Sequence, residues 1–195
     1  MSPAIPPRSS SREFSGWRMI LWLDLALLVL VRRWERTTAT RMMRALTRLG
    51  NTSTWVLLTC VLATVGDDGP LYALLLATAA AFGLVVSQAL KRVCRRSRPS
   101  VGIGGRAVLA LVENPDAFSF PSGHTAVAFA VAVALAGQGT GLGTVALVLA
   151  AGIGLSRVYL GAHYPLDVAA GAILGAGTGW LARAAVMGGL ADMFL

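Results

Sequence analysis

The sequence predicts an all-α protein, a polytopic bundle of membrane-spanning helices. Two observations lead to this fold class. The mean hydropathy of +0.67 and the 55% share of hydrophobic residues are far above those of a soluble domain. The charged residues also gather in short stretches between long apolar segments. The chain is therefore expected to be one membrane-embedded domain over residues 17–195, preceded by a polar, disordered tail over residues 1–16.

The first apolar segment, residues 19–31, is shorter than the roughly 20 residues that a span needs. It carries Asp24 near its middle, and a carboxylate at that depth costs about 2.5–3.5 kcal/mol unless it faces protein. A short span and a helix lying in the membrane plane are both compatible with this segment. A basic connector follows, with six arginines over residues 32–48.

Five further spans are predicted, at residues 49–66, 71–90, 123–138, from the glycine-rich turn at 139–141 to about 156, and 165–187. The total is six transmembrane helices, or five if the first segment lies in plane. In either case residues 91–121 and 156–165 emerge on the same side of the membrane. Gly171, Gly175 and Gly179 recur every four residues in the last span and predict close helix packing.

The composition limits the possible partners. A net charge of +8, from 17 basic and 9 acidic residues, suits anionic lipid headgroups or a phosphate-bearing substrate. No nucleic-acid-binding module is recognisable. Cys60 and Cys94 cannot specify a disulfide framework, so both are expected to be free thiols.

Basic residues beside the spans can hold a phosphate. Lys91 and Arg98 are seven residues apart, so they share one helix face if the helix continues to Ser97. A cluster that merely flanks the membrane is the alternative interpretation. Arg157 lies on the same side of the membrane and adds a third cation.

Two histidines complete the pattern, each at a predicted helix N-terminus. His124 follows Ser122 and Gly123, where Ser122 is the expected N-cap and free backbone N–H groups favour an anion. His163 precedes a helix whose first turn contains Asp167, close enough to fix the imidazole tautomer. Such a set predicts phosphoryl transfer, with an imidazole attacking phosphorus and fixed cations stabilising the developing charge.

Three motifs carry a resemblance to a known family. K-x6-R-P at residues 91–99, P-S-G-H at 121–124 and S-R-x5-H-x3-D at 156–167 resemble, without departure, the signature motifs of the type 2 phosphatidic acid phosphatase superfamily. The resemblance implies a six-helix membrane phosphatase that needs no metal or other cofactor. It further implies His163 as nucleophile, Asp167 as its orienter and His124 as general acid, with phosphate bound by Lys91, Arg98, Ser122, Gly123 and Arg157.

The function expected from this resemblance is hydrolysis of a lipid phosphate. Undecaprenyl pyrophosphate, phosphatidic acid and phosphatidylglycerol phosphate are equally compatible substrates. A lipid phosphotransferase and a non-catalytic lipid-phosphate-binding protein are the alternatives. Vanadium haloperoxidases look alike at these positions, but they are soluble and the predicted spans argue against them.

The expected location is a bacterial cell membrane. Resemblance to bacterial relatives implies a site on the outer face, whereas the excess of basic residues on the side of the site argues for the cytoplasm.

Overall fold

The computed structural model describes residues 13–100, 109–113, 116–137 and 141–193. Regular structure in these residues consists of helices and one isolated β-bridge between Ser97 and Phe118. The prediction of an all-α protein is confirmed for this part of the chain. The helices are α1 (Glu13–Arg32), α2 (Thr37–Leu49), α3 (Thr52–Leu62), α4 (Gly69–Cys94), α5 (Gly123–Ala136), α6 (Leu142–Tyr159) and α7 (Pro165–Met193).

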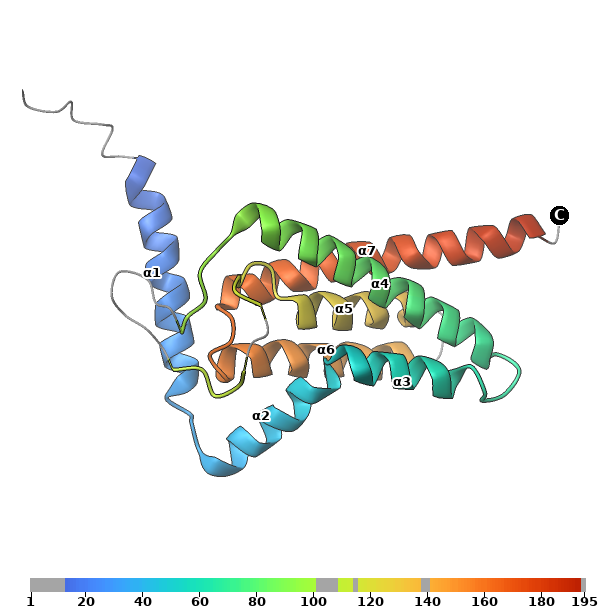
Figure 1. Cartoon of the computed structure of the whole chain (residues 1–195), viewed down its shortest axis with the longest axis horizontal. Coiled ribbons are helices and arrows are strands. Elements are labelled where there is room, and N and C mark those ends of the chain that lie inside the picture. The colour runs from blue at the N-terminus through green and yellow to red at the C-terminus, as the bar shows by residue number, and fades with distance from the viewer. Residues whose placement is uncertain (1–12, 101–108, 114–115, 138–140, 194–195) are drawn as a thin grey trace, which may run out of the picture.

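Helix α5 forms the centre of a bundle in which α3 to α7 run along one common direction (Figure 1). Its side chains are small, and Ala126, Ala130 and Ala134 are completely buried between α4, α6 and α7. Helix α1 instead runs across one end of this bundle, and α2 leads obliquely from that end into α3.

The predicted glycine stripe packs α7 directly against the backbone of α5. A Cβ atom on Gly171 would lie 2.6 Å from the carbonyl oxygen of Ser122, and one on Gly175 would lie 2.3 Å from that of Ala126. Only glycine fits at such distances, because a Cβ atom would clash with the backbone. The prediction of close packing is confirmed, and it holds the N-terminus of α5 beside that of α7.

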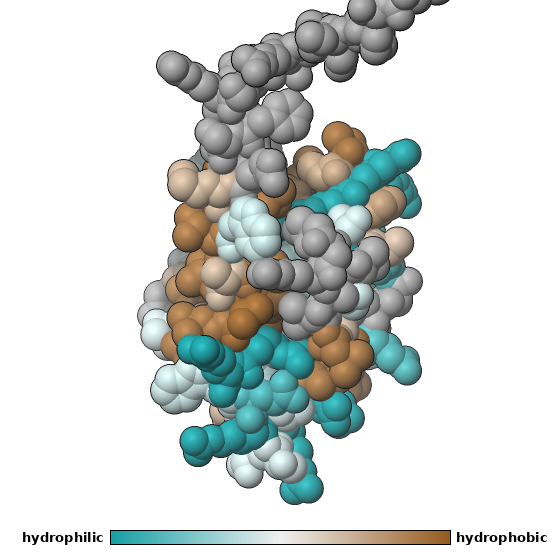
Figure 2. Space-filling model, turned by 90° about the vertical axis from the view of Figure 1, so that its left-hand side faces the viewer, coloured by the Kyte–Doolittle hydropathy of each residue, from teal (hydrophilic) through white to brown (hydrophobic). Residues whose placement is uncertain are grey.

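The outer faces of the helices are apolar and exposed. Two described helices, α4 and α6, are long and apolar enough to cross a membrane, and α3 and α5 are shorter apolar helices. Exposed apolar side chains also cover much of α1, among them Met19, Leu23 and Leu27. Figure 2, which views this end of the molecule, shows apolar side chains over its middle and hydrophilic ones gathered below them, at the height of α2.

Helix boundaries differ from the predicted ones at three places. Helix α3 covers only the middle of the predicted span 49–66, because α2 continues to Leu49 and Gly50 closes it. Helix α4 ends at Cys94, so the continuation to Ser97 that would place Lys91 and Arg98 on one helix face does not occur. Arg95 adopts a left-handed conformation (φ 45°) and terminates the helix there. Helix α1 begins at Glu13, and residues 1–12 of the expected tail lie outside the described residues.

Candidate active site

Polar side chains converge at the end of the bundle that α1 crosses. They come from the last turns of α4, the α4–α5 connection, the first turn of α5, the end of α6, the α6–α7 connection and the first turn of α7, as the sequence predicted. All eight predicted site residues lie here, and most are withdrawn from solvent. Lys91, Arg98 and Arg157 are each at most 4% exposed, and Ser122, His163 and Asp167 at most 1%.

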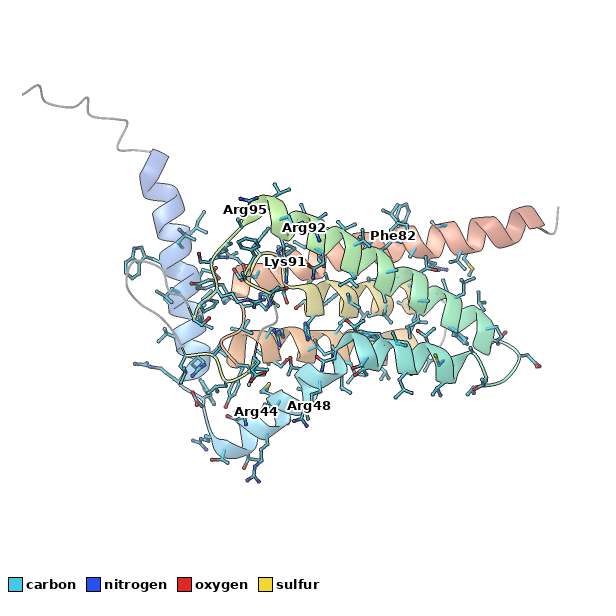
Figure 3. All side chains as sticks on the ribbon, viewed as in Figure 1. Arg44, Arg48, Phe82, Lys91, Arg92 and Arg95 are labelled. Carbon is cyan, nitrogen blue, oxygen red and sulfur yellow. The ribbon has the colours of Figure 1, made fainter. Side chains whose placement is uncertain are left out.

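Lys91 and Arg98 converge on the carboxylate of Asp116. Lys91 Nζ pairs with one carboxylate oxygen and Arg98 Nη2 with the other, while Arg98 Nε donates to the Asp116 carbonyl oxygen at 2.8 Å. The two cations meet because the chain reverses after Arg95, and not because they share a helix face. Figure 3 shows Lys91 pointing into the bundle, with Arg92 and Arg95 on its outer side.

Lys91 and Arg98 form a clamp that can hold an oxyanion. Two buried cations hold two oxygen atoms of one group, which is how fixed cations bind two phosphate oxygens. The carboxylate of Asp116 therefore stands where a phosphate would be held between Lys91 and Arg98. Burial lowers the pKa of Arg98 to about 10, so this guanidinium remains charged at neutral pH.

His163 lies between this clamp and Asp167. Its Nε2 is 3.4 Å from Arg98 Nη1, and its Nδ1 is 3.6 Å from Asp167 Oδ2. Because a guanidinium N–H can only donate, the nitrogen facing Arg98 is the unprotonated one, which places the ring proton on Nδ1 beside the carboxylate. Burial, together with the positive charges of Arg157, Arg98 and Lys91, lowers the pKa of His163 well below its usual value. The imidazole is therefore neutral and presents a lone pair to the clamp.

The chain reaches this geometry through a tight turn after α6. Gly161 has φ 70°, which favours glycine, and the backbone N–H groups of Ala162 and His163 both donate to the Arg157 carbonyl oxygen. His163 is thus held by the same residue whose guanidinium belongs to the site.

Asp167 is fixed by α7 itself. Its Oδ2 accepts from the backbone N–H of Tyr164 at 2.9 Å, a reach back across the first helical turn, and its Oδ1 accepts from Arg96 Nη1 at 2.7 Å. Asp167 lies beside His163, as expected, but the 3.6 Å between Asp167 Oδ2 and His163 Nδ1 is too long for a hydrogen bond. The backbone carbonyl of Asp167 also accepts from Ser122 N at 2.9 Å, which ties α7 to α5.

The N-terminus of α5 faces the clamp. A Cβ atom on Gly123 would lie 3.9 Å from Lys91 Nζ. Ser122 occupies the N-cap position as predicted, but its hydroxyl accepts from Thr125 Oγ1 at 2.9 Å and makes no capping bond to the helix backbone. His124 Nε2 lies 3.1 Å from Asn51 Oδ1, so this imidazole has a partner from another helix end.

Arg157 completes the site from the end of α6. Its Nη1 donates to Thr47 Oγ1 of α2 at 2.8 Å, and both side chains are buried. The basic connector is thereby joined to the site through its one buried polar residue.

Two cavities meet at His124. The first, about 410 Å³, is lined mainly by apolar side chains of α3, α4 and α5, including Trp55, Leu84 and Val127, and ends at Lys91 and Asp116. The second, about 560 Å³, is polar and is lined by residues that include Arg44, Arg48, Glu113 and Arg157. Figure 3 shows Arg44 and Arg48 on α2, at the same end of the molecule. The arrangement can receive a molecule that is apolar at one end and charged at the other.

Several residues at the site were missed in the sequence. Asp116 and Asn51 lie in connecting segments, where the sequence pattern does not indicate which residues they contact. Arg96 lies between Lys91 and Arg98 in the chain and was given no role in the predicted site, yet it bonds Asp167. Asp24 offered a signal, because a lone acidic residue in an apolar helix needs a partner.

A family model described as the PAP2 superfamily matches residues 72–188. This range is more than half of the chain and contains all eight predicted site residues. The chain belongs to the PAP2 superfamily. The resemblance inferred from the three motifs is confirmed.

Known PAP2 proteins agree with this assignment. A decaprenylphosphoryl-5-phosphoribose phosphatase of Mycobacterium tuberculosis is 37% identical over 94 residues, which are 46% of this chain and 48% of that protein. The crystal structure of LpxE from Aquifex aeolicus superimposes with a TM-score of 0.70 at 26% identity, covering 82% of this chain and 94% of that one.

A transmembrane PAP2-type phosphatidylglycerolphosphate phosphatase of Bacillus subtilis superimposes with a TM-score of 0.68 at 25% identity, covering 85% of each chain. The matches to curated relatives span only 32–48% of the length of those proteins. The family model and the two solved structures establish the family and the fold over most of the chain. The activity has to be inferred from the geometry of the site.

Proposed function

We propose that this protein is a membrane phosphatase that hydrolyses a phosphomonoester or pyrophosphate on a lipid. The observation that carries the proposal is the meeting of an apolar and a polar cavity at His124, beside the cation clamp and His163. A lipid phosphate has matching chemistry, with its chain in the apolar cavity and its phosphate among the cations. Relatives named as lipid-phosphate phosphatases support the same class of substrate.

The phosphate would replace the Asp116 carboxylate between Lys91 and Arg98, with Arg157 as the third cation. His163 Nε2 would then attack phosphorus, forming a phosphohistidine as the bond to the lipid oxygen breaks. The fixed cations stabilise the charge on the equatorial oxygens without reorganisation. Asp167, whose Oδ2 lies 3.6 Å from Nδ1, would stabilise the positive charge that the imidazole gains.

His124 would donate a proton to the leaving lipid oxygen and later accept one from the attacking water. Its position between the two cavities places it at the junction that the leaving oxygen and water would share. Hydrolysis then releases inorganic phosphate and restores His163.

Three guanidinium or ammonium groups supply the positive charge that a divalent metal supplies in many phosphoryl-transfer sites. A divalent cation placed in the clamp would be repelled by Lys91, Arg98 and Arg157. We therefore propose that the reaction needs no metal.

Helices α3 to α7 would cross the bilayer, because they run along one direction and expose apolar side chains. The crosswise direction of α1 supports the alternative with five spans, in which α1 contacts lipid at the end of the bundle (Figure 1). In that position the clamp lies at one membrane face, where lipid headgroups are found.

The test is phosphate release from detergent-solubilised lipid phosphates: phosphatidic acid, phosphatidylglycerol phosphate and undecaprenyl pyrophosphate. We expect the purified protein to release inorganic phosphate from at least one, and a water-soluble phosphomonoester to be a much poorer substrate. No release from any lipid, or equal rates on the soluble ester, would reject the proposal.

A further inference from the structure

The carboxylate of Asp24 lies buried in the middle of the apolar segment 19–31 of helix α1. It is 1% exposed, and both of its oxygens are bonded to the candidate active site. Oδ2 lies 2.5 Å from Arg96 Nη2, and Oδ1 accepts from the backbone N–H of Leu166 at 2.9 Å. An isolated buried charge is strongly unfavourable, so these two partners account for its presence on α1.

Arg96 divides its two terminal nitrogens between two carboxylates. Nη2 pairs with Asp24, while Nη1 pairs with Asp167 Oδ1 at 2.7 Å. The guanidinium plane also stacks over the ring of Tyr164, with 4.2 Å between its central carbon and the ring centroid. The orientation of Arg96 is thus fixed on three sides, and a planar fork held in this way determines where its partners sit.

The sharing of Arg96 between two carboxylates determines which oxygen of Asp167 faces His163. A guanidinium facing a single carboxylate tends to bind both of its oxygens, in two parallel hydrogen bonds. With Asp24 occupying Nη2, Arg96 holds only Oδ1 of Asp167, and Oδ2 stays on the side of His163 Nδ1. Loss of Asp24 would free Nη2 to compete for Oδ2 and turn the carboxylate away from the imidazole.

Asp24 also acts on the first turn of α7. Leu166 N donates to Asp24 and Tyr164 N donates to Asp167, so two carboxylates share the free N–H groups of this helix end. Tyr164 and Leu166 follow His163 closely in the chain. Helix α1 is therefore bonded to the segment that carries the candidate nucleophile.

We propose that Asp24 is a positioning residue, which acts through Arg96 to keep Asp167 directed at His163. The inference rests on the proposed phosphatase function and deepens it. Asp24 and Arg96 form no hydrogen bond or ion pair with Lys91 or Arg98. Substitution of either residue should therefore slow the chemical step and leave substrate binding nearly unchanged.

The first test compares kcat and KM of Asp24→Asn, Arg96→Gln and the double variant with those of the wild-type protein. Asp24→Asn should lower kcat about 10- to 100-fold, as expected for a small misplacement of a catalytic group, with KM within about threefold. In the Arg96→Gln background the same change should lower kcat by less than about threefold, because both residues act on one path. Independent, multiplicative effects would overturn the proposal.

Leu28→Ala is the matched control. Leu28 is buried one turn beyond Asp24 on α1, in the apolar cluster that includes Tyr164, and its aliphatic side chain cannot form an ion pair or a hydrogen bond with Arg96. It should lower the thermal unfolding temperature and leave kcat within about threefold. A loss of kcat as large as that of Asp24→Asn would show that docking of α1, and not its carboxylate, is what matters. If Asp24→Asn does not fold, Arg96→Lys serves instead, since an ammonium cannot bridge two carboxylates as the fork does. It should lower kcat at least about tenfold, and retained kcat would contradict the proposal.

A second test needs no turnover. The chain has only two histidines, so the ¹⁵N NMR signals of His163 can be assigned with a His163→Ala variant. In the wild-type protein Nδ1 should carry the proton, and Asp24→Asn should shift the Nδ1 signal because the Asp167 carboxylate turns away from it. An unchanged Nδ1 chemical shift would refute the inference. Failure of the wild-type protein to hydrolyse any lipid phosphate would instead reject the proposed function, and the NMR result would still decide the role of Asp24.

Discussion

Asp116 provides the sharpest test of the phosphate clamp. Its carboxylate pairs with both Lys91 and Arg98, so an incoming oxyanion must displace it. Asp116→Asn removes the competing negative charge and leaves the two cations in place. We expect this variant to bind orthovanadate, which mimics five-coordinate phosphorus, more tightly than the wild-type protein.

The size of the effect follows from the environment of the pair. Hydrogen bonds to charged groups are worth about 1.5–3 kcal/mol each, but the Asp116 side chain is 32% exposed and solvent screens part of this energy. We therefore expect the competition to cost an anion about 1–2 kcal/mol in all, which corresponds to about 5- to 30-fold in the dissociation constant.

The same substitution should act oppositely on stability. Without an anion, the buried Lys91 and Arg98 lose their carboxylate partner, and the unfolding temperature should fall by about 2–4 °C for each kcal/mol lost. Vanadate should restore it, with a larger shift than in the wild-type protein, because the stabilisation by a ligand grows with the logarithm of its concentration divided by its dissociation constant. Thermal unfolding in detergent with increasing vanadate measures both effects without a lipid substrate.

Glu113→Gln is the control for this experiment. Glu113 is an acidic residue of the same connection, and it lines the polar cavity without an ion pair to any described residue. Its removal should leave vanadate affinity within about twofold. Equal or weaker vanadate binding by Asp116→Asn would refute the competition and make Asp116 part of the anion site.

Four further predictions follow from the site. His163→Ala should abolish turnover and the acid-labile, base-stable labelling by radioactive lipid phosphate, while Asp167→Asn should leave a small residual rate; labelling that persists without His163 would exclude it as the nucleophile. Activity should survive EDTA, and a loss that divalent ions restore would contradict the metal-free mechanism. Because the attacking imidazole must be neutral and burial lowers the pKa of His163, lowering the pH from 7 to 6 should not reduce kcat/KM through this group; a fall in kcat/KM centred near the ordinary histidine pKa of about 6.5 that Asp167→Asn displaces would argue against this. Cys94, exposed at the end of α4, should react with a membrane-impermeant thiol reagent in intact cells of a Cys60→Ala variant if the site faces outward, as the bacterial relatives suggest, whereas labelling only after permeabilisation would place it in the cytoplasm.

The sequence alone determined the class of the fold and located the eight predicted site residues that the structure brings together at one end of the bundle. Apolar segments separated by charged stretches specify membrane helices, because each segment has to suit the bilayer along its whole length. The three motifs could be located in the same way, since their residues lie close together in the chain. Their convergence also followed from counting passes, as each pass reverses the side on which the next connection emerges.

The tertiary structure decided which residues bond to one another across the chain. Asp24 and Arg96 are 72 residues apart, and His124 and Asn51 are 73 apart, so no local pattern links them. The approach of Lys91 to Arg98 depends on the left-handed Arg95, which ends α4 earlier than the helical spacing suggested. Asp116 meets both cations only once that reversal has brought the α4–α5 connection back over the site. Long apolar segments indicate which parts of the chain are helical. Ion pairs between distant buried groups depend instead on how those helices pack, and the packing is set by close contacts such as those of Gly171 and Gly175 with α5.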